Sequence, residues 1–124
     1  SVTAVEVVEA SVKSADENAL ANGIKNAKFI HAKAEDAINR VLKEKTYDAV
    51  IVDPPRKGLD KKVVEMLNAS GIEKIVYISC NHASLARDIA LMSEVYKVER
   101  VAAVDMFARS GHLESVVLMT RENE

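Results

Sequence analysis

The chain has 124 residues, enough for one domain but too few for two. Its formal net charge of −2 at pH 7 excludes the basic excess of a protein that holds nucleic-acid phosphates unaided. Hydrophobic residues make up 48% and charged residues 29%, which excludes a disordered tail and predicts a single folded domain over residues 1–124.

Short β-branched runs alternate with helical periodicity, which is typical of βαβ units and predicts an α/β fold with a mostly parallel sheet. Strands are predicted, in chain order, at Val2–Val8, Lys28–His31, Tyr47–Val52, Ile75–Ile78, Tyr96–Val104 and Glu114–Met119. Helices are predicted between them, at Val8–Ala19, Ala34–Leu42, Val63–Leu67 and Leu85–Met92. Asn81 or Ser84 is the expected N-cap of the last helix. The final two strands leave no room for a connecting helix, so they are expected to form an antiparallel pair.

Cys80 is the single cysteine, which excludes an internal disulfide framework and a zinc site built from cysteines. His31 and His112 have no carboxylate or second histidine at ligand spacing on one element, so no metal site is predicted. No apolar run approaches the roughly 20 residues of a membrane span, and no targeting segment is recognisable. These features favour a reducing, cytoplasmic setting without a membrane partner.

Polar residues interrupt the pattern where predicted strands end, namely at Glu6, Asp53, Cys80 and Asp105. Ligands bind outside the carboxyl ends of the strands in open α/β sheets, so these residues predict a site at one edge. A lone cysteine is often only a small buried hydrophobe. Cys80, however, lies between a strand and a helix N-terminus, where backbone N–H groups and the helix dipole favour a nucleophilic thiolate. Glu114, taken alone, is simply the polar first residue of a strand.

Three motifs stand in order along the chain: Val52–Leu59 (VDPPRKGL), Tyr77–Asp88 with YISCN and LARD, and Asp105–Glu114 with DMF and GHLE. Together they resemble the C-terminal catalytic part of the S-adenosylmethionine-dependent RNA uracil-5-methyltransferases, most nearly the branch that methylates 23S ribosomal RNA. The resemblance covers nearly the whole chain. It implies a Rossmann-like methyltransferase fold, S-adenosylmethionine as cofactor and RNA, most of all 23S rRNA, as partner.

The resemblance implies a role for each residue at the predicted edge. Cys80 matches the nucleophile that adds to carbon 6 of uracil, and Glu114 matches the base that removes the proton from carbon 5. Asp53 matches the acid beside the target uracil, and Asn81 is placed with it at the substrate. Arg87 and Asp88 are expected to form a structural pair on the helix after the nucleophile.

Cofactor binding is implied for three carboxylates. Glu6 matches the residue that accepts hydrogen bonds from the cofactor ribose, Asp36 lies where the family approaches the adenine, and Asp53 is placed beside the cofactor as well as the substrate. The four glycines of the chain are too far apart for a Gly-x-Gly-x-x-Gly nucleotide loop.

The chain departs from the family at His82, where a proline usually follows the Cys-Asn pair, and at Phe107–Ser110, which stands for a Phe-Pro-x-Thr segment. The family's first strand and glycine-rich loop are expected upstream of Ser1, so the chain resembles part of a larger enzyme. That strand is expected between Val2–Val8 and Tyr47–Val52, so these two edges should pair directly or be covered in a homodimer. The chain alone is expected to bind S-adenosylmethionine weakly or not at all and to be inactive.

Three alternatives stay open. The substrate could be transfer RNA rather than ribosomal RNA. Asp53-Pro54-Pro55 is also typical of amino-methyltransferases, although those enzymes place an aromatic residue where this chain has Arg56, and they leave Cys80 and Glu114 without a role. The chain could also be a non-catalytic α/β module.

Overall fold

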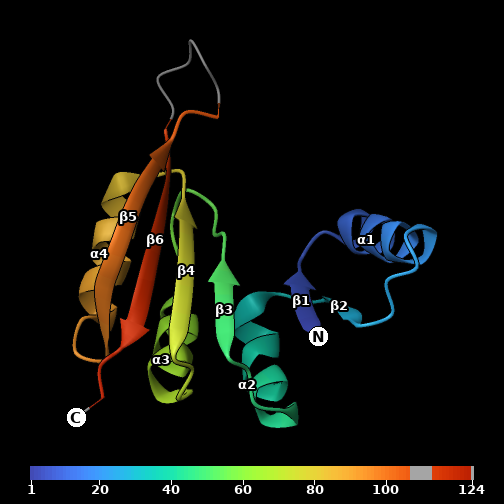
Figure 1. The fold of residues 1–124 in the computed structure, drawn as a ribbon, viewed down its shortest axis with the longest axis horizontal. Coiled ribbons are helices and arrows are strands. Elements are labelled where there is room, and N and C mark those ends of the chain that lie inside the picture. The colour runs from blue at the N-terminus through green and yellow to red at the C-terminus, as the bar shows by residue number, and fades with distance from the viewer. Residues whose placement is uncertain (107–112, 124) are drawn as a thin grey trace. The chain divides into compact units, whose positions relative to one another are not determined.

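The computed structural model of the chain describes residues 1–106 and 113–123. Residues 107–112, which include the predicted departure at Phe107–Ser110 and His112 of the third motif, lie outside the described residues, as does Glu124. The chain divides into two compact units, residues 1–45 and 46–124, and each is described by itself (Figure 1). The single domain over residues 1–124 stays a prediction.

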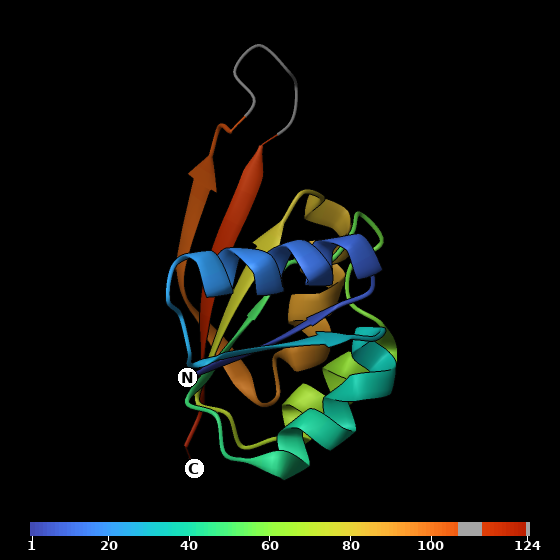
Figure 2. The same cartoon turned by 90° about the vertical axis from the view of Figure 1, so that its right-hand side faces the viewer.

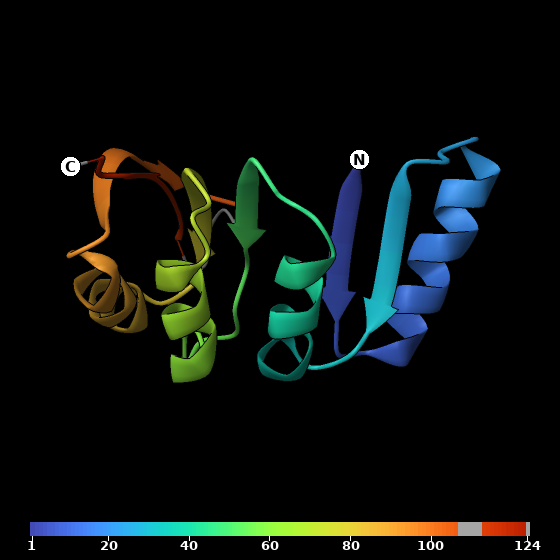
Figure 3. The same ribbon diagram turned by 90° about the horizontal axis from the view of Figure 1, so that it is seen from below.

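The first unit is a βαβα segment. Its elements are, in chain order, β1 (Val2–Glu6), α1 (Glu9–Ala21), β2 (Ala27–His31) and α2 (Ala34–Glu44). β1 and β2 are parallel neighbours, as Figure 3 shows, and their register runs from Val2 opposite Ala27 to Glu6 opposite His31. α2 packs against β1 and buries Ala37 and Val41, which are four residues apart and therefore lie on one helix face.

The second unit is a mixed sheet with two helices. Its elements are, in chain order, β3 (Ala49–Val52), α3 (Lys61–Ala69), β4 (Lys74–Ser79), α4 (His82–Met92), β5 (Tyr96–Val104) and β6 (Glu114–Arg121). The strand order is β3-β4-β6-β5, with β3 parallel to β4. β6 is antiparallel to both of its neighbours, which confirms the predicted antiparallel pair at the end of the chain. Figure 2 shows β5 and β6 side by side.

The core of the second unit lies on one face of this sheet. Alternate residues of β4 and β6 point to that face and are buried: Ile75, Tyr77, Val117 and Met119. α3 and α4 cover the same face, as Figure 3 shows, and supply the buried side chains Val63, Val64, Leu67, Leu85 and Met92. In the described part of the chain no helix has the length and apolar character of a membrane span.

Direct pairing between the strands predicted at Val2–Val8 and Tyr47–Val52 would join the two units, and it stays a prediction. Among the described residues β1 pairs with β2 and β3 pairs with β4, in separate sheets. Each of these parallel ladders joins two strands that are consecutive along the chain and connected by a single crossover helix, α1 or α3. The crossover within each unit therefore accounts for these two ladders. The alternative, a homodimer that covers the edges, stays a prediction.

Candidate active site

The predicted strand-end residues of the second unit lie at one edge of its sheet. β3, β4 and β5 run in the same direction because β6 is antiparallel to both β4 and β5. Asp53, Cys80 and Asp105 each follow the last residue of one of these strands. β6 begins at the same edge with Glu114. The fold therefore brings together carboxylates and a thiol from four strands.

Cys80 and Glu114 are placed next to each other by the β4–β6 ladder. This ladder ends with Ser79 opposite Ser115, and one position further along each chain come Cys80 and Glu114. Both residues are half-buried. Because side chains alternate along a strand, Glu114 shares the face of Val116, opposite the face that α3 and α4 cover. A thiol and a carboxylate thus stand at adjacent positions, just past the last pair of the β4–β6 ladder.

The turn that carries Cys80 is held by hydrogen bonds on both sides of the cysteine. Ser79 Oγ donates to Asn81 O at 2.8 Å and accepts from Asn81 N at 3.0 Å. Asn81 Oδ1 accepts from Ala83 N at 2.9 Å and from Ser84 N at 3.1 Å, so Asn81, and not Ser84, is the N-cap of α4. The thiol lies just before the N-terminus of α4. The substrate role of Asn81 stays a prediction.

Asp88 on α4 is the most heavily bonded carboxylate described here, and no part of its side chain is exposed. Its Oδ2 accepts from Tyr77 Oη at 2.6 Å and from Leu59 N at 2.8 Å. Its Oδ1 accepts from Arg87 Nε at 3.1 Å and Nη2 at 2.9 Å. Burial raises the pKa of Tyr77 far above its usual value, with a further contribution from the hydrogen bond to Asp88, so the hydroxyl stays a donor.

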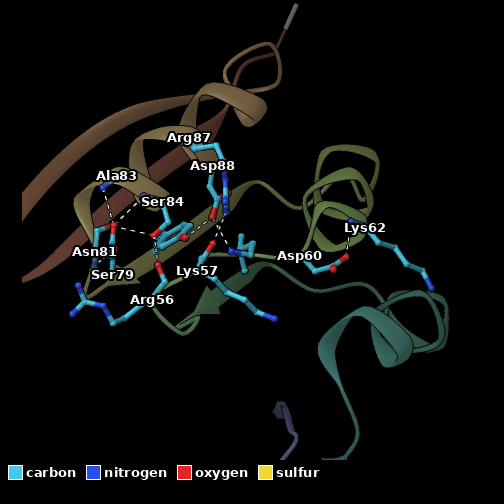
Figure 4. Close-up of polar contacts among 12 residues, drawn as sticks. Arg56, Lys57, Asp60, Lys62, Ser79, Asn81, Ala83, Ser84, Arg87 and Asp88 are labelled. Carbon is cyan, nitrogen blue, oxygen red and sulfur yellow. Dashed lines mark hydrogen bonds and ion pairs between the residues drawn. The ribbon is translucent and has the colours of Figure 1, made fainter.

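The same helix face holds the loop that follows β3. Ser84 Oγ donates to Arg56 O at 2.8 Å, and Arg87 Nη2 donates to Lys57 O at 2.7 Å. With the bond from Leu59 N to Asp88, three hydrogen bonds fasten the loop backbone to one face of α4, as Figure 4 shows. We call Ser84, Arg87 and Asp88 the α4 clamp.

The loop reaches the clamp through Gly58, whose φ of +82° lies in the left-handed region. A Cβ at this position lies 2.5 Å from Arg87 Nη2 and 2.6 Å from Asp88 Oδ2, so only glycine fits against the clamp. The sequence predicted Arg87 and Asp88 as a pair but missed Ser84 and Gly58. The spacing of Ser84 and Asp88, four residues apart on one helix face, is the signal that could have found the clamp.

Gly58→Ala is expected to destabilise the chain by about 3 kcal/mol, because a left-handed alanine costs about 1–2 kcal/mol and overpacking adds about 1–3 kcal/mol. Gly71→Ala is the matched control, since its φ is +77° but nothing lies within 4 Å of the added Cβ. The control should lose only the backbone part. Urea unfolding of both variants measures the difference, and equal losses would contradict a tight seat for Gly58.

Glu6 and Asp36 belong to the first unit, where Glu6 is the last residue of β1 and Asp36 lies in the helix that follows β2. Glu6 ends β1, is exposed, and its Oε1 accepts from Val8 N at 2.8 Å. The strand was predicted to continue to Val8. This turn explains why β1 stops at Glu6 instead. Asp36 is exposed in the first turn of α2. In residues 1–106 and 113–123, no group of three or more metal-ligating side chains could hold an ion.

Comparison with known proteins identifies a family model, described as tRNA (Uracil-5-)-methyltransferase, that matches residues 1–122. A relative from Enterococcus faecalis described as an uncharacterized RNA methyltransferase is 45% identical over 122 residues. The match covers 97% of this chain and 27% of the relative. The chain therefore spans only about a quarter of the length of the curated relatives it matches.

Solved structures give the same result for the fold. The Pyrococcus abyssi tRNA (uracil-54, C5)-methyltransferase in complex with S-adenosyl-L-homocysteine superposes with a TM-score of 0.84 at 32% identity, over 95% of this chain and 28% of that one. An rRNA methylase from Streptococcus thermophilus superposes with a TM-score of 0.70 at 16% identity, over 98% of this chain and 73% of that one. The second likeness shows the fold alone. The predicted α/β, Rossmann-like methyltransferase fold is confirmed.

Proposed function

The chain belongs to the tRNA (uracil-5-)-methyltransferase family, and from this premise we propose that it is the catalytic portion of an enzyme that methylates carbon 5 of uracil in RNA. The observation that carries the proposal is the adjacency of Cys80 and Glu114 at the end of the β4–β6 ladder. A nucleophile and a base at neighbouring positions are what this reaction needs, because carbon 5 of uracil is a poor nucleophile until carbon 6 has been attacked.

S-adenosylmethionine is the proposed methyl donor, and it supplies an electrophilic methyl group when bound. Glu6 is suited to the ribose, because an exposed carboxylate has lone pairs on both oxygens beyond the one that Val8 N occupies. Asp36 is proposed near the adenine and Asp53 beside both cofactor and substrate. The weak cofactor binding and inactivity expected of this chain alone stay predictions.

Cys80 begins the reaction. Its thiol loses a proton, and the thiolate forms a bond to carbon 6 of uracil while the carbon 5–carbon 6 double-bond electrons move towards oxygen 4. The turn capped by Asn81 holds the backbone of Cys80 in place before the attack. Asp53, at the end of β3, is proposed to hold the pyrimidine edge, with Asn81 beside it. Carbon 5 is now nucleophilic and accepts the methyl group.

Glu114 completes the reaction as a general base. Its carboxylate removes the remaining proton from carbon 5, and the electrons of that bond re-form the double bond to carbon 6. The bond between carbon 6 and the Cys80 sulfur breaks in the same step, which releases methylated RNA and regenerates the thiolate. Glu114 then passes its proton to solvent.

The proposed substrate is 23S ribosomal RNA, with transfer RNA as the second candidate. The motifs favour the ribosomal branch, whereas the family description and the Pyrococcus abyssi structure both name tRNA. Either substrate has to be bound largely by other parts of the enzyme, because this chain carries a net charge of −2.

The test is a methylation assay with the full-length enzyme, S-adenosylmethionine carrying a labelled methyl group, and transcripts of 23S rRNA and tRNA. Nucleoside analysis should find 5-methyluridine. Its presence in the ribosomal transcript would support 23S rRNA as the substrate, and its presence in tRNA would support the second candidate. A methyl group on an exocyclic nitrogen would instead support an amino-methyltransferase that uses Asp53-Pro54-Pro55. No methylation of either RNA would contradict the proposed function.

A further inference from the structure

We propose that the α4 clamp sets the position of Asp53 relative to Cys80, so that Ser84, Arg87 and Asp88 are positioning residues for the reaction. The inference rests on the proposed function, since Asp53 and Cys80 act there on one uracil. It assigns to the clamp more than the structural role expected of the Arg87–Asp88 pair.

Ser84 is the residue that connects the two parts of the site. Its backbone N–H donates to Asn81 Oδ1 at 3.1 Å, which ties it to the turn that carries Cys80. Its hydroxyl donates to Arg56 O at 2.8 Å and lies 3.3 Å from Asn81 O. Figure 4 shows Ser84 between the Asn81 turn and the loop of Arg56. Ser84 is bonded both to the loop and to the turn that carries Cys80. A shift of the loop therefore has to break or stretch a hydrogen bond to Ser84.

The loop can transmit this position to Asp53 because it is stiff. Only Pro54 and Pro55 separate Asp53 from Arg56, and a proline ring holds φ near −65°. Gly58 N donates to Pro55 O at 2.9 Å, which closes the next turn. With Arg56, Lys57 and Leu59 bonded to α4, little freedom is left for the backbone that carries Asp53.

Stability alone is a weak explanation for the clamp. A carboxylate without exposed surface is expensive to desolvate, and a buried ion pair adds little net stability compared with apolar packing. Directional bonds to three loop backbone groups, in contrast, define a single position of the loop. Catalysis requires the reacting groups to be held in one position, because a misplacement of about 1 Å can lower a rate about 100-fold.

The experiment compares Ser84→Ala with Ser93→Ala in the full-length enzyme. Ser93 is the matched control, since it follows α4 and its hydroxyl donates to Ala90 O at 2.8 Å, within the end of the helix. Ser84→Ala is expected to lower kcat about 10- to 100-fold, with KM for S-adenosylmethionine within about twofold of the original. Hydrogen exchange of the Leu59 amide should become about fivefold faster, as for one lost hydrogen bond. Ser93→Ala should change neither.

Arg87→Ala provides a second route to the same loop, because Arg87 reaches Lys57 O and its side chain is half exposed. The double variant with Ser84→Ala should lose less in kcat than the product of the two single losses, since both act on one loop position. Unchanged kcat in Ser84→Ala, with methylation intact in the unaltered enzyme, would overturn the inference. An unaltered enzyme that fails to methylate uracil would instead overturn the proposed function, and the positioning role with it.

Discussion

Cys80→Ala is expected to lower methylation of uracil by at least about 10⁴-fold, because without the sulfur nothing adds to carbon 6 and carbon 5 stays unreactive. Cys80→Ser should lose almost as much activity, since a serine hydroxyl is a much weaker nucleophile than a cysteine sulfur. The position of the residue, between the end of β4 and the N-cap of α4, is the reason to expect this reactivity.

The measurement has two parts, both made on the full-length enzyme. The first is incorporation of labelled methyl groups into RNA. The second is a covalent adduct with RNA that carries 5-fluorouridine, because fluorine at carbon 5 cannot be removed as a proton and the intermediate is trapped. Mass spectrometry should locate the adduct at Cys80. His82→Ala is the control, because His82 is exposed at the start of the same helix. The enzyme with this substitution should keep its methylation activity. Full methylation by Cys80→Ala would exclude the proposed mechanism.

Glu114→Gln is expected to let addition and methyl transfer proceed but to stop release, lowering turnover by about 10²- to 10⁴-fold. Glutamine keeps the size of glutamate but cannot take the proton from carbon 5. The bond between Cys80 and carbon 6 therefore cannot break, and a protein–RNA complex should accumulate even on RNA without fluorine.

Denaturing gel electrophoresis of the variant with labelled RNA detects this complex. Glu99→Gln is the matched control, because Glu99 lies on β5 near the opposite end of β6, where its Oε1 accepts from Thr120 Oγ1 at 2.8 Å. The control should release product normally. A Glu114→Gln enzyme that turns over freely, or that forms no complex, would show that another group is the base.

Most elements of the fold could be predicted because their signals are local. Tyr96–Val104 was predicted with the bounds that the structure has, and Asn81 was one of two expected caps for α4. The ends of β1 and β3 were less predictable. Val7 and Val8 suit a strand, but the hydrogen bond from Val8 N to Glu6 Oε1 turns the chain towards α1. A side-chain contact of this kind overrides a propensity for extended structure.

The residues of the candidate site could be located for the same reason, since a polar residue that ends an apolar run can be recognised without knowing its neighbours. Asp53 and Cys80 were found in this way, and the motifs around them implied their roles. Glu114, the polar first residue of β6, was singled out only by the resemblance of its motif. That these positions meet at one edge follows from the parallel direction of β3, β4 and β5.

The insertion of β6 between β4 and β5 and the α4 clamp depend instead on the tertiary structure. Nothing local to Glu114 indicates that it stands beside Cys80, because the ladder joins segments separated by α4 and β5. Likewise, Ser84 and Asp88 reveal their function only when the loop of Arg56–Leu59 lies against them. Strand and helix patterns depend on residues that are neighbours along the chain, and so they can be predicted from the sequence. Contacts between distant segments arise from packing and backbone hydrogen bonds that form only once the chain has folded.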